Sequence, residues 1–309
     1  EGAIGFEKAF ALAQDAGIEV LEIALPWDEY ETKPGKYADK WLPQINYFYP
    51  RYGTRIALSL NPIDTNNLRL PKDLKEKALN DPLVIERYRS FIGFVASKLP
   101  DAKVFYVAIG NEVDVTLGTS EQRWREYTEF YRAVAPFVEE KFPQAVIGSK
   151  VTFESALRQS DSVKQLGSDQ DELFVTYYPF EPGGFQVRDE QSVHDDFRRI
   201  LDLYPDKKIY FTEIGYPSGK DNGSSEEKQA EFIKQAFIAW DTYATRVPYL
   251  NFLWLHDKSK KEVAEFERYY GISDKGFLSF LGTLGLRTYE GEDKPAYTEL
   301  RKSAQERGW

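Results

Sequence analysis

Cysteine and methionine are both absent from this chain of 309 residues, and histidine occurs only twice. Without cysteine there is no disulfide and no thiol catalysis, although this does not fix the cellular compartment. Two histidines are too few for a histidine-rich metal site, so we expect no metal and no cofactor; a structural calcium held by oxygen ligands stays open. The lack of methionine has two open explanations. Either the source or design avoids it, or methionines are missing from the sequence as given, and some spacings are then one residue short.

The chain also lacks long apolar runs and an excess of basic residues. It contains no apolar run of about 18 residues, so the sequence predicts no membrane span. Its net charge is −10 and its pI is near 5.0. Such a surface repels phosphate backbones, so we expect no nucleic-acid partner. The chain begins at Glu1 without an initiator methionine, so we expect a processed or trimmed form, and we expect a monomer.

What the chain does contain is an alternation of strand and helix patterns along its whole length, which is typical of α/β proteins with a parallel sheet. The ranges predicted as strands are 18–25, 54–60, 103–109, 145–151, 173–178, 209–211 and 249–255. The ranges predicted as helices are 4–16, 41–52, 82–98, one beginning at 120, 189–203, 225–243 and one from 294 or 295 onward, with a loop at 278–286.

The arrangement of these elements favours one fold within the α/β class. Polar residues end nearly every predicted strand, and no phosphate-binding glycine-rich loop appears. We therefore predict a single-domain (β/α)8 barrel, or TIM barrel, over residues 1–309 rather than a doubly wound sheet. No strand precedes the first helix, so strand one of this barrel lies upstream or is irregular.

Two of the predicted strands end in a glutamate with distinctive flanks. Residues 103–114 read KVFYVAIGNEVD, an apolar strand followed by Gly110, Asn111 and Glu112. Residues 207–218 read KKIYFTEIGYPS, with Glu213 at the end of the strand. Barrels place their chemistry at the carboxyl ends of strands, and two carboxylates in one cleft is the arrangement that glycoside hydrolysis needs. Either glutamate alone is also compatible with a solvated carboxylate at a strand end.

At these residues the sequence resembles the retaining glycoside hydrolases of the (β/α)8 superfamily. These enzymes carry an acid/base glutamate after asparagine on strand four and a nucleophile glutamate on strand seven. The GNEV and TEIGYPS strings are most similar to the β-1,3-glucanase and endo-β-1,4-galactanase branches, and residues 284–300 are similar to the closing segment of many such enzymes. The resemblance implies that Glu112 is the general acid/base and Glu213 the nucleophile. It further implies retaining hydrolysis of a β-linked oligo- or polysaccharide, with transglycosylation as a variant, in a secreted, periplasmic or cell-surface protein.

The resemblance also implies residues that bind the sugar. Asn111 corresponds to the asparagine that hydrogen-bonds the 2-hydroxyl group, a contact that strengthens in the transition state. Tyr178 or Tyr177 corresponds to the tyrosine that orients the nucleophile; strand alternation sends only one of them inward, and we prefer Tyr178. Trp254 corresponds to a tryptophan floor on which the apolar face of a pyranose stacks. Turn formation by Asn111 and core packing by the aromatic residues are the alternatives.

Other residues are weaker candidates. Trp27 and Asn61 follow predicted strands two and three and could contact sugar in outer subsites, although polar loop residues are common in barrels. Glu154 is a third strand-end carboxylate but lacks the flanks of the other two. A carbohydrate-binding barrel without activity would keep the aromatic residues and lose the chemistry. A barrel aldolase or lyase would need a phosphate loop or a strand lysine, for which Lys150 is the obvious candidate.

Overall fold

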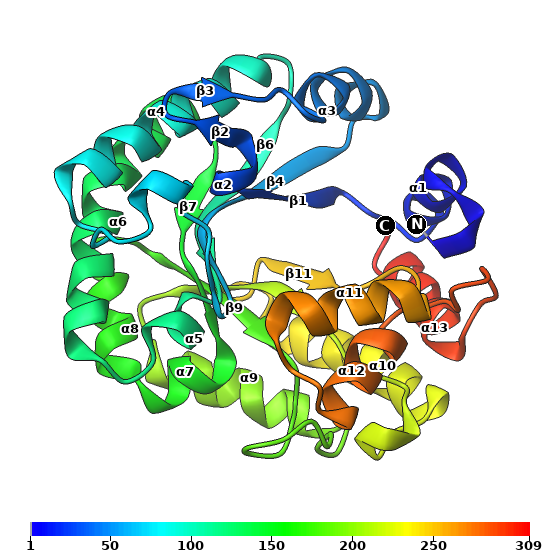
Figure 1. Cartoon of the computed structure of the whole chain (residues 1–309). Helices are drawn as coiled ribbons and strands as arrows, with labels where there is room; N and C mark the ends of the chain where they lie inside the picture. Colours follow the sequence, from blue (N-terminus) through cyan, green and yellow to red (C-terminus); the bar gives the residue numbers. More distant parts are fainter. Residues whose placement is uncertain (1) are drawn as a thin grey trace. The chain divides into compact units, whose positions relative to one another are not determined.

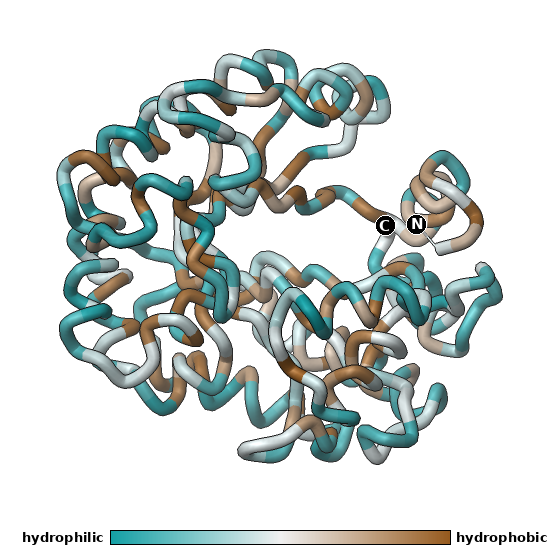
Figure 2. Tube along the Cα trace, in the orientation of Figure 1, coloured by the Kyte–Doolittle hydropathy of each residue, from teal (hydrophilic) through white to brown (hydrophobic). Residues whose placement is uncertain are grey.

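The computed structural model describes residues 2–309, and the chain divides into two compact units. The N-terminal unit is Glu19–Val175, and the C-terminal unit combines Glu1–Ile18 with Thr176–Trp309. Figure 1 shows each unit as strands accompanied by helices. In Figure 2 hydrophobic residues recur along the strands, whereas many outer helical turns are hydrophilic. The alternation read from the sequence is therefore present within each unit.

The N-terminal unit contains a parallel sheet with the strand order β1-β4-β6-β7. These strands are β1 (Val20–Pro26), β4 (Arg55–Asp64), β6 (Val104–Asn111) and β7 (Val146–Gly148). The short β5 (Asn67–Leu68) folds back antiparallel on the end of β4. Most residues of β4 and β6 are buried, as expected for strands covered on both faces. The strand predicted at 145–151 is divided between β7 and β8 (Lys150–Thr152).

Two long helices of this unit, α4 (Pro82–Lys98) and α6 (Glu121–Lys141), begin where the sequence predicted them. Asp81 accepts a hydrogen bond from the Leu83 backbone N–H at 2.8 Å, and Ser120 caps α6 in the same way. The remaining short elements are α2 (Trp27–Tyr30), β2 (Glu31–Lys33), β3 (Lys36–Tyr37), α3 (Leu42–Phe48), η2 (Tyr49–Tyr52), η3 (Lys72–Leu74), α5 (Val113–Leu117), α7 (Phe153–Arg158) and α8 (Ser160–Leu166).

The sheet that leads into the C-terminal unit has the order β11-β10-β9-β8. Its strands beyond β8 are β9 (Glu172–Tyr177), β10 (Lys208–Ile214) and β11 (Tyr249–Phe252). The helical elements of the C-terminal unit are η1 (Gly2–Ile4), α1 (Phe6–Asp15), α9 (Ser192–Leu203), η4 (Lys220–Asn222), α10 (Glu226–Tyr243), α11 (Lys260–Tyr270), α12 (Lys275–Thr283) and α13 (Pro295–Gln305). Strand β9 and helix α10 match the sequence prediction to within one residue at each end, whereas β10 continues three residues beyond the predicted end at Phe211.

The segment after β11 is where the prediction was wrong. A loop was expected over 278–286, but α12 occupies most of it, and α11 was not predicted at all. Each helix has a good N-cap: Ser259 and Glu262 form a capping box, and Asp274 accepts a hydrogen bond from the Phe277 N–H at 2.9 Å. The predicted strand 249–255 ends earlier, at Phe252.

A buried ion pair ties the closing segment of the chain into the C-terminal unit. The Lys294 ammonium group donates to the Asp257 carboxylate at 2.7 Å, to the Gly285 carbonyl at 2.8 Å and to the Ser218 hydroxyl at 3.1 Å. Lys294 is only 2% exposed. Burial raises the pKa of Asp257 to about 6, even though the charge of Lys294 opposes that rise. This ion pair therefore links the segment over 284–300, which resembled the closing part of glycoside hydrolases, to the segment that follows β11.

We predict that Lys294→Met lowers the free energy of unfolding by about 3 kcal/mol or more at pH 7.5, because it leaves Asp257 as an uncompensated buried charge. The loss should be smaller at pH 6 than at pH 7.5, because without the charge of Lys294 the pKa of Asp257 rises further and the protonated carboxyl group carries no charge. Urea denaturation at both pH values measures this. The matched control is Lys302→Met on α13, whose side chain is 59% exposed and which should change stability little. Equal effects of the two substitutions would contradict the role given to Lys294.

Candidate active site

The end of β6 turns sharply and places Glu112 at the start of a short helix. Gly110 has a φ of +82°, and a Cβ atom there would lie 2.5 Å from the Val113 side chain, so glycine is needed. Glu112 follows with a φ of +43° in the left-handed region and is the N-cap residue of α5. Because two residues with a positive φ, on either side of Asn111, end the strand, backbone geometry places the half-buried Glu112 carboxylate.

The end of the neighbouring strand β4 and the turn that follows it supply hydrogen-bond partners for both polar residues at this turn. The Thr65 hydroxyl donates to Glu112 Oε2 at 3.0 Å. The Asn111 side-chain amide donates to Asp64 Oδ1 at 3.1 Å. Asp64 and Asn111 are paired in the parallel register of β4 and β6, which explains how residues 47 positions apart meet. Sequence reasoning missed Thr65, because nothing in the sequence shows this pairing.

Asp114, two residues after Glu112, anchors the short helix α5. Its carboxylate accepts hydrogen bonds from the Thr152 backbone N–H at 2.8 Å and from the Thr152 hydroxyl at 2.7 Å. Burial raises the pKa of Asp114, and its hydrogen bonds with Thr152 oppose that rise. Thr152 in turn caps α7, so one carboxylate connects the segments that follow β6 and β8.

In the C-terminal unit, Glu213 lies near the end of β10 and contacts a tyrosine from β9's end. The Tyr178 hydroxyl donates to Glu213 Oε2 at 2.8 Å. Tyr177, which precedes it, is fully buried and donates instead to Asp196 at 2.7 Å. Strand alternation therefore sends Tyr178 and not Tyr177 to Glu213, the arrangement that was preferred from the sequence. A hydroxyl donor stabilises the ionised form of a carboxylate, which is the form a nucleophile requires.

Aromatic side chains of α11 and α12 pack around this part of the C-terminal unit. Phe280 meets Tyr178 edge to face, with ring centroids 4.9 Å apart. Trp254 lies two residues beyond β11 and stacks on Phe266 at 5.8 Å, with Lys258 Nζ 4.6 Å from its ring centroid. The two unpredicted helices thus support the tyrosine that contacts Glu213 and the tryptophan predicted to bind sugar.

Two predicted sugar-binding residues lie inside the N-terminal unit instead. Trp27 is fully buried, packs against Tyr88 with ring centroids 5.1 Å apart, and donates its indole N–H to Glu31 at 2.8 Å. Asn61 is 2% exposed and accepts a hydrogen bond from the Ser59 hydroxyl at 2.9 Å. Trp27 has no ring face left for a sugar, and Asn61 is part of the sheet interior, so we do not carry either into the candidate site.

Lys150 and Glu154, the alternative candidates from the sequence, lie in surroundings that do not suit catalysis. Lys150 is buried in an ion pair with Glu22, which leaves it unsuited to attack a carbonyl substrate. Glu154 lies in α7 with a 46% exposed side chain and pairs with Arg158 at 3.4 Å, as a solvated helix residue does. Among residues 2–309, no group of three or more His, Cys, Asp or Glu side chains could hold a metal ion. None of the helices in the same range is both long and apolar enough to cross a membrane.

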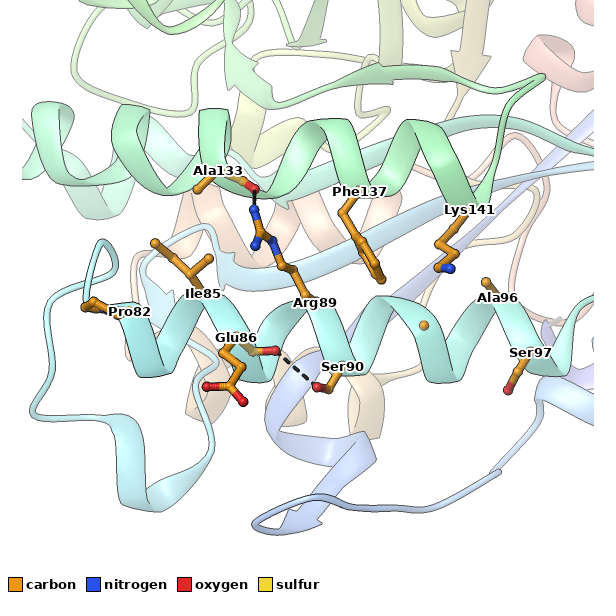
Figure 3. Close-up of a pocket in the computed structure, with 11 residues that line it drawn as sticks. Pro82, Ile85, Glu86, Arg89, Ser90, Ala96, Ser97, Ala133, Phe137 and Lys141 are labelled. Carbon is orange, nitrogen blue, oxygen red and sulfur yellow. Dashed lines mark hydrogen bonds between the residues drawn. The ribbon is translucent and has the colours of Figure 1, made fainter.

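A surface groove of about 920 Å³ lies between α4 and α6 (Figure 3). Its lining includes Ile85, Gly93 and Phe137, and Arg89 spans it to donate to the Ala133 carbonyl. Neither Asn111 nor Glu112 lines it. Since the groove belongs to two packed helices and not to strand ends, we place no chemistry there.

Comparisons with known proteins find the same fold. No family model and no curated protein matches the sequence. Among solved structures, a GH5_18 protein from Streptomyces cattleya in complex with Manb1-4GlcNAc is 14% identical, with a TM-score of 0.74 over 97% of this chain and 76% of the other. An exo-beta-1,4-mannosidase from Opitutaceae bacterium strain TAV5 is 16% identical, with a TM-score of 0.75 over 97% and 55%. The Ignisphaera aggregans GH53 catalytic domain is 17% identical, with a TM-score of 0.65 over 96% and 88%.

Likeness at this level of identity establishes the fold. The chain has the (β/α)8 fold of these structures, which confirms the predicted fold class. It does not single out the glucanase or galactanase branch. The further step from fold to reaction depends on the residues at the strand ends.

Proposed function

We propose that this protein is a retaining glycoside hydrolase acting on β-linked oligo- or polysaccharides. The observation that carries the proposal is the Tyr178–Glu213 hydrogen bond at a strand end, on a fold shared with glycoside hydrolases. Asn111 and Glu112 at the end of β6 provide the second carboxylate and an amide beside it. In a (β/α)8 barrel the carboxyl ends of strands supply one active site, so the two glutamates would serve the same substrate.

The proposed reaction proceeds in two displacements at the anomeric carbon. Glu213 attacks this carbon and forms a covalent glycosyl ester, while Glu112 donates its proton to the departing glycosidic oxygen. Ionised Glu112 then removes a proton from water, whose oxygen attacks the same carbon and releases Glu213. Each displacement inverts the anomeric carbon, so the product keeps the β configuration. A sugar hydroxyl in place of water gives transglycosylation. Asn111 would bind the 2-hydroxyl group, and Trp254 the apolar sugar face.

The comparisons suggest which sugars to try first. Two of the similar structures involve β-1,4-linked mannose, so mannosides join galactan and β-glucans as candidate substrates. We expect the purified protein to cleave at least one of β-mannan, Manβ1-4GlcNAc, β-1,4-galactan, β-1,3-glucan and aryl β-glycosides. Proton NMR of the first product formed should show the β anomer before mutarotation. A first product with the α anomer would contradict the retaining mechanism. Sugar binding without cleavage of any of them would favour an inactive carbohydrate-binding barrel.

A further inference from the structure

Thr65 has a backbone conformation that its residue type disfavours. Its φ is +55°, and it lies in the tight turn between β4 and β5. Threonine has a branched Cβ, and a positive φ in such residues is a genuine outlier that costs free energy. Glycine is the usual residue at a positive φ in a two-residue hairpin turn. Outliers of this kind persist where surrounding contacts hold them, and they cluster at functional sites.

Three further contacts hold Thr65 against the end of β6. Its backbone N–H donates to the Asn111 carbonyl at 2.8 Å, and its backbone carbonyl accepts from the Thr116 hydroxyl at 2.7 Å. The Asn111 amide approaches the Thr65 hydroxyl at 3.5 Å. These contacts direct the Thr65 hydroxyl toward Glu112, to which it donates at 3.0 Å. The main-chain contacts would survive replacement by glycine, whereas the hydroxyl contact would not.

We propose that Thr65 is a positioning residue that orients the Glu112 carboxyl group and sets the pH at which that group loses its proton. This deepens the proposed function, on which the catalytic reading of Glu112 rests. A hydroxyl that donates to a carboxylate stabilises the ionised form relative to the protonated form. The Thr65 hydroxyl thereby makes Glu112 a stronger acid and fixes the orientation of its carboxyl group.

Four variants separate this role from a structural one. Thr65→Val removes the hydroxyl and keeps the side-chain shape, and Thr65→Ser keeps the hydroxyl. Thr65→Gly removes the hydroxyl but suits the positive φ, so it should not lower the thermal midpoint of unfolding. Thr119→Val is the matched control, because Thr119 is exposed and lies in the same unit.

In Thr65→Val and Thr65→Gly, the alkaline limb of the pH profile of kcat/KM should move up by about one pH unit, and kcat/KM for a poor leaving group should fall about tenfold. Thr65→Ser and Thr119→Val should stay close to the wild type. If Thr65→Gly is stable and still shows the shifted alkaline limb, the shift comes from the loss of the hydroxyl contact with Glu112 and not from impaired folding. An unshifted limb in the valine and glycine variants, or a serine variant as impaired as valine, would overturn the proposal.

A second measurement does not need turnover. The ¹³C carboxyl signal of Glu112, assigned by its loss in Glu112→Gln, should titrate about one pH unit higher in Thr65→Val than in the wild type. If the wild type hydrolyses no glycoside but this shift occurs, the proposed function fails and the contact stands. If hydrolysis occurs and the titration does not move, the role of Thr65 fails alone.

Discussion

Glu213→Gln is expected to lower kcat/KM for glycoside hydrolysis by roughly 10³-fold or more, with little change in stability. The amide keeps the size of the carboxylate and can still contact the Tyr178 hydroxyl, but it cannot form the glycosyl ester. The loss should be similar for aryl glycosides with good and poor leaving groups, since the missing group is the attacking atom and not the acid. Initial rates on a reactive aryl β-glycoside and on the natural linkage measure the loss for a good and for a poor leaving group.

A small anion can take the place of the missing nucleophile. Glu213→Ala in concentrated azide should form a glycosyl azide of the α configuration, because azide attacks a β-linked substrate once, from the side that Glu213 occupied. Glu154→Gln is the matched control, since Glu154 is the third strand-end carboxylate and lies on a solvated helix turn. If Glu154→Gln loses activity as severely as Glu213→Gln, or a β-azide forms in Glu213→Ala, the assignment of Glu213 is wrong.

The features of the site that could be predicted from the sequence are those that depend on local sequence pattern. Strands β6 and β10 are largely buried runs with polar residues and glycine at their carboxyl ends, so the positions of Glu112 and Glu213 near strand ends follow from local pattern. Tyr178 was preferred over Tyr177 by the pleat of one strand, and the hydrogen bond to Glu213 agrees. Each of these features depends on neighbouring residues in the chain.

The parts that could not be read depend on contacts distant in sequence or on ambiguous local signals. Thr65 meets Glu112 across 47 positions, and no rule assigns a positive φ to threonine. Helix α12 contains Gly276 and Gly282, which weaken a helical pattern, and its stability comes from the packing of Phe277 and Phe280. Trp27 looked like a loop residue, but the short α2 turns it into the core.

Glu112→Ala is expected to give a loss that depends on the leaving group, unlike the loss at Glu213. Without the acid, a poor leaving group must depart without a proton, and its cleavage should slow by about 10³-fold. A dinitrophenyl glycoside needs no proton to leave, so formation of its glycosyl ester should be nearly unaffected. The second step lacks its base, so the ester should accumulate after a rapid burst of dinitrophenol. Stopped-flow absorbance and mass spectrometry of the quenched protein measure the burst and the ester.

The azide product then distinguishes the two glutamates with one reagent. In Glu112→Ala, azide needs no general base and attacks the ester that Glu213 has formed, so the product should be the β-glycosyl azide, and turnover should rise with azide concentration. The same reagent should give the α-azide when Glu213 is removed. Opposite configurations from the two alanine variants require two displacements and assign one to each residue. Equal losses on good and poor leaving groups in Glu112→Ala, with no β-azide, would remove Glu112 from the role of acid/base.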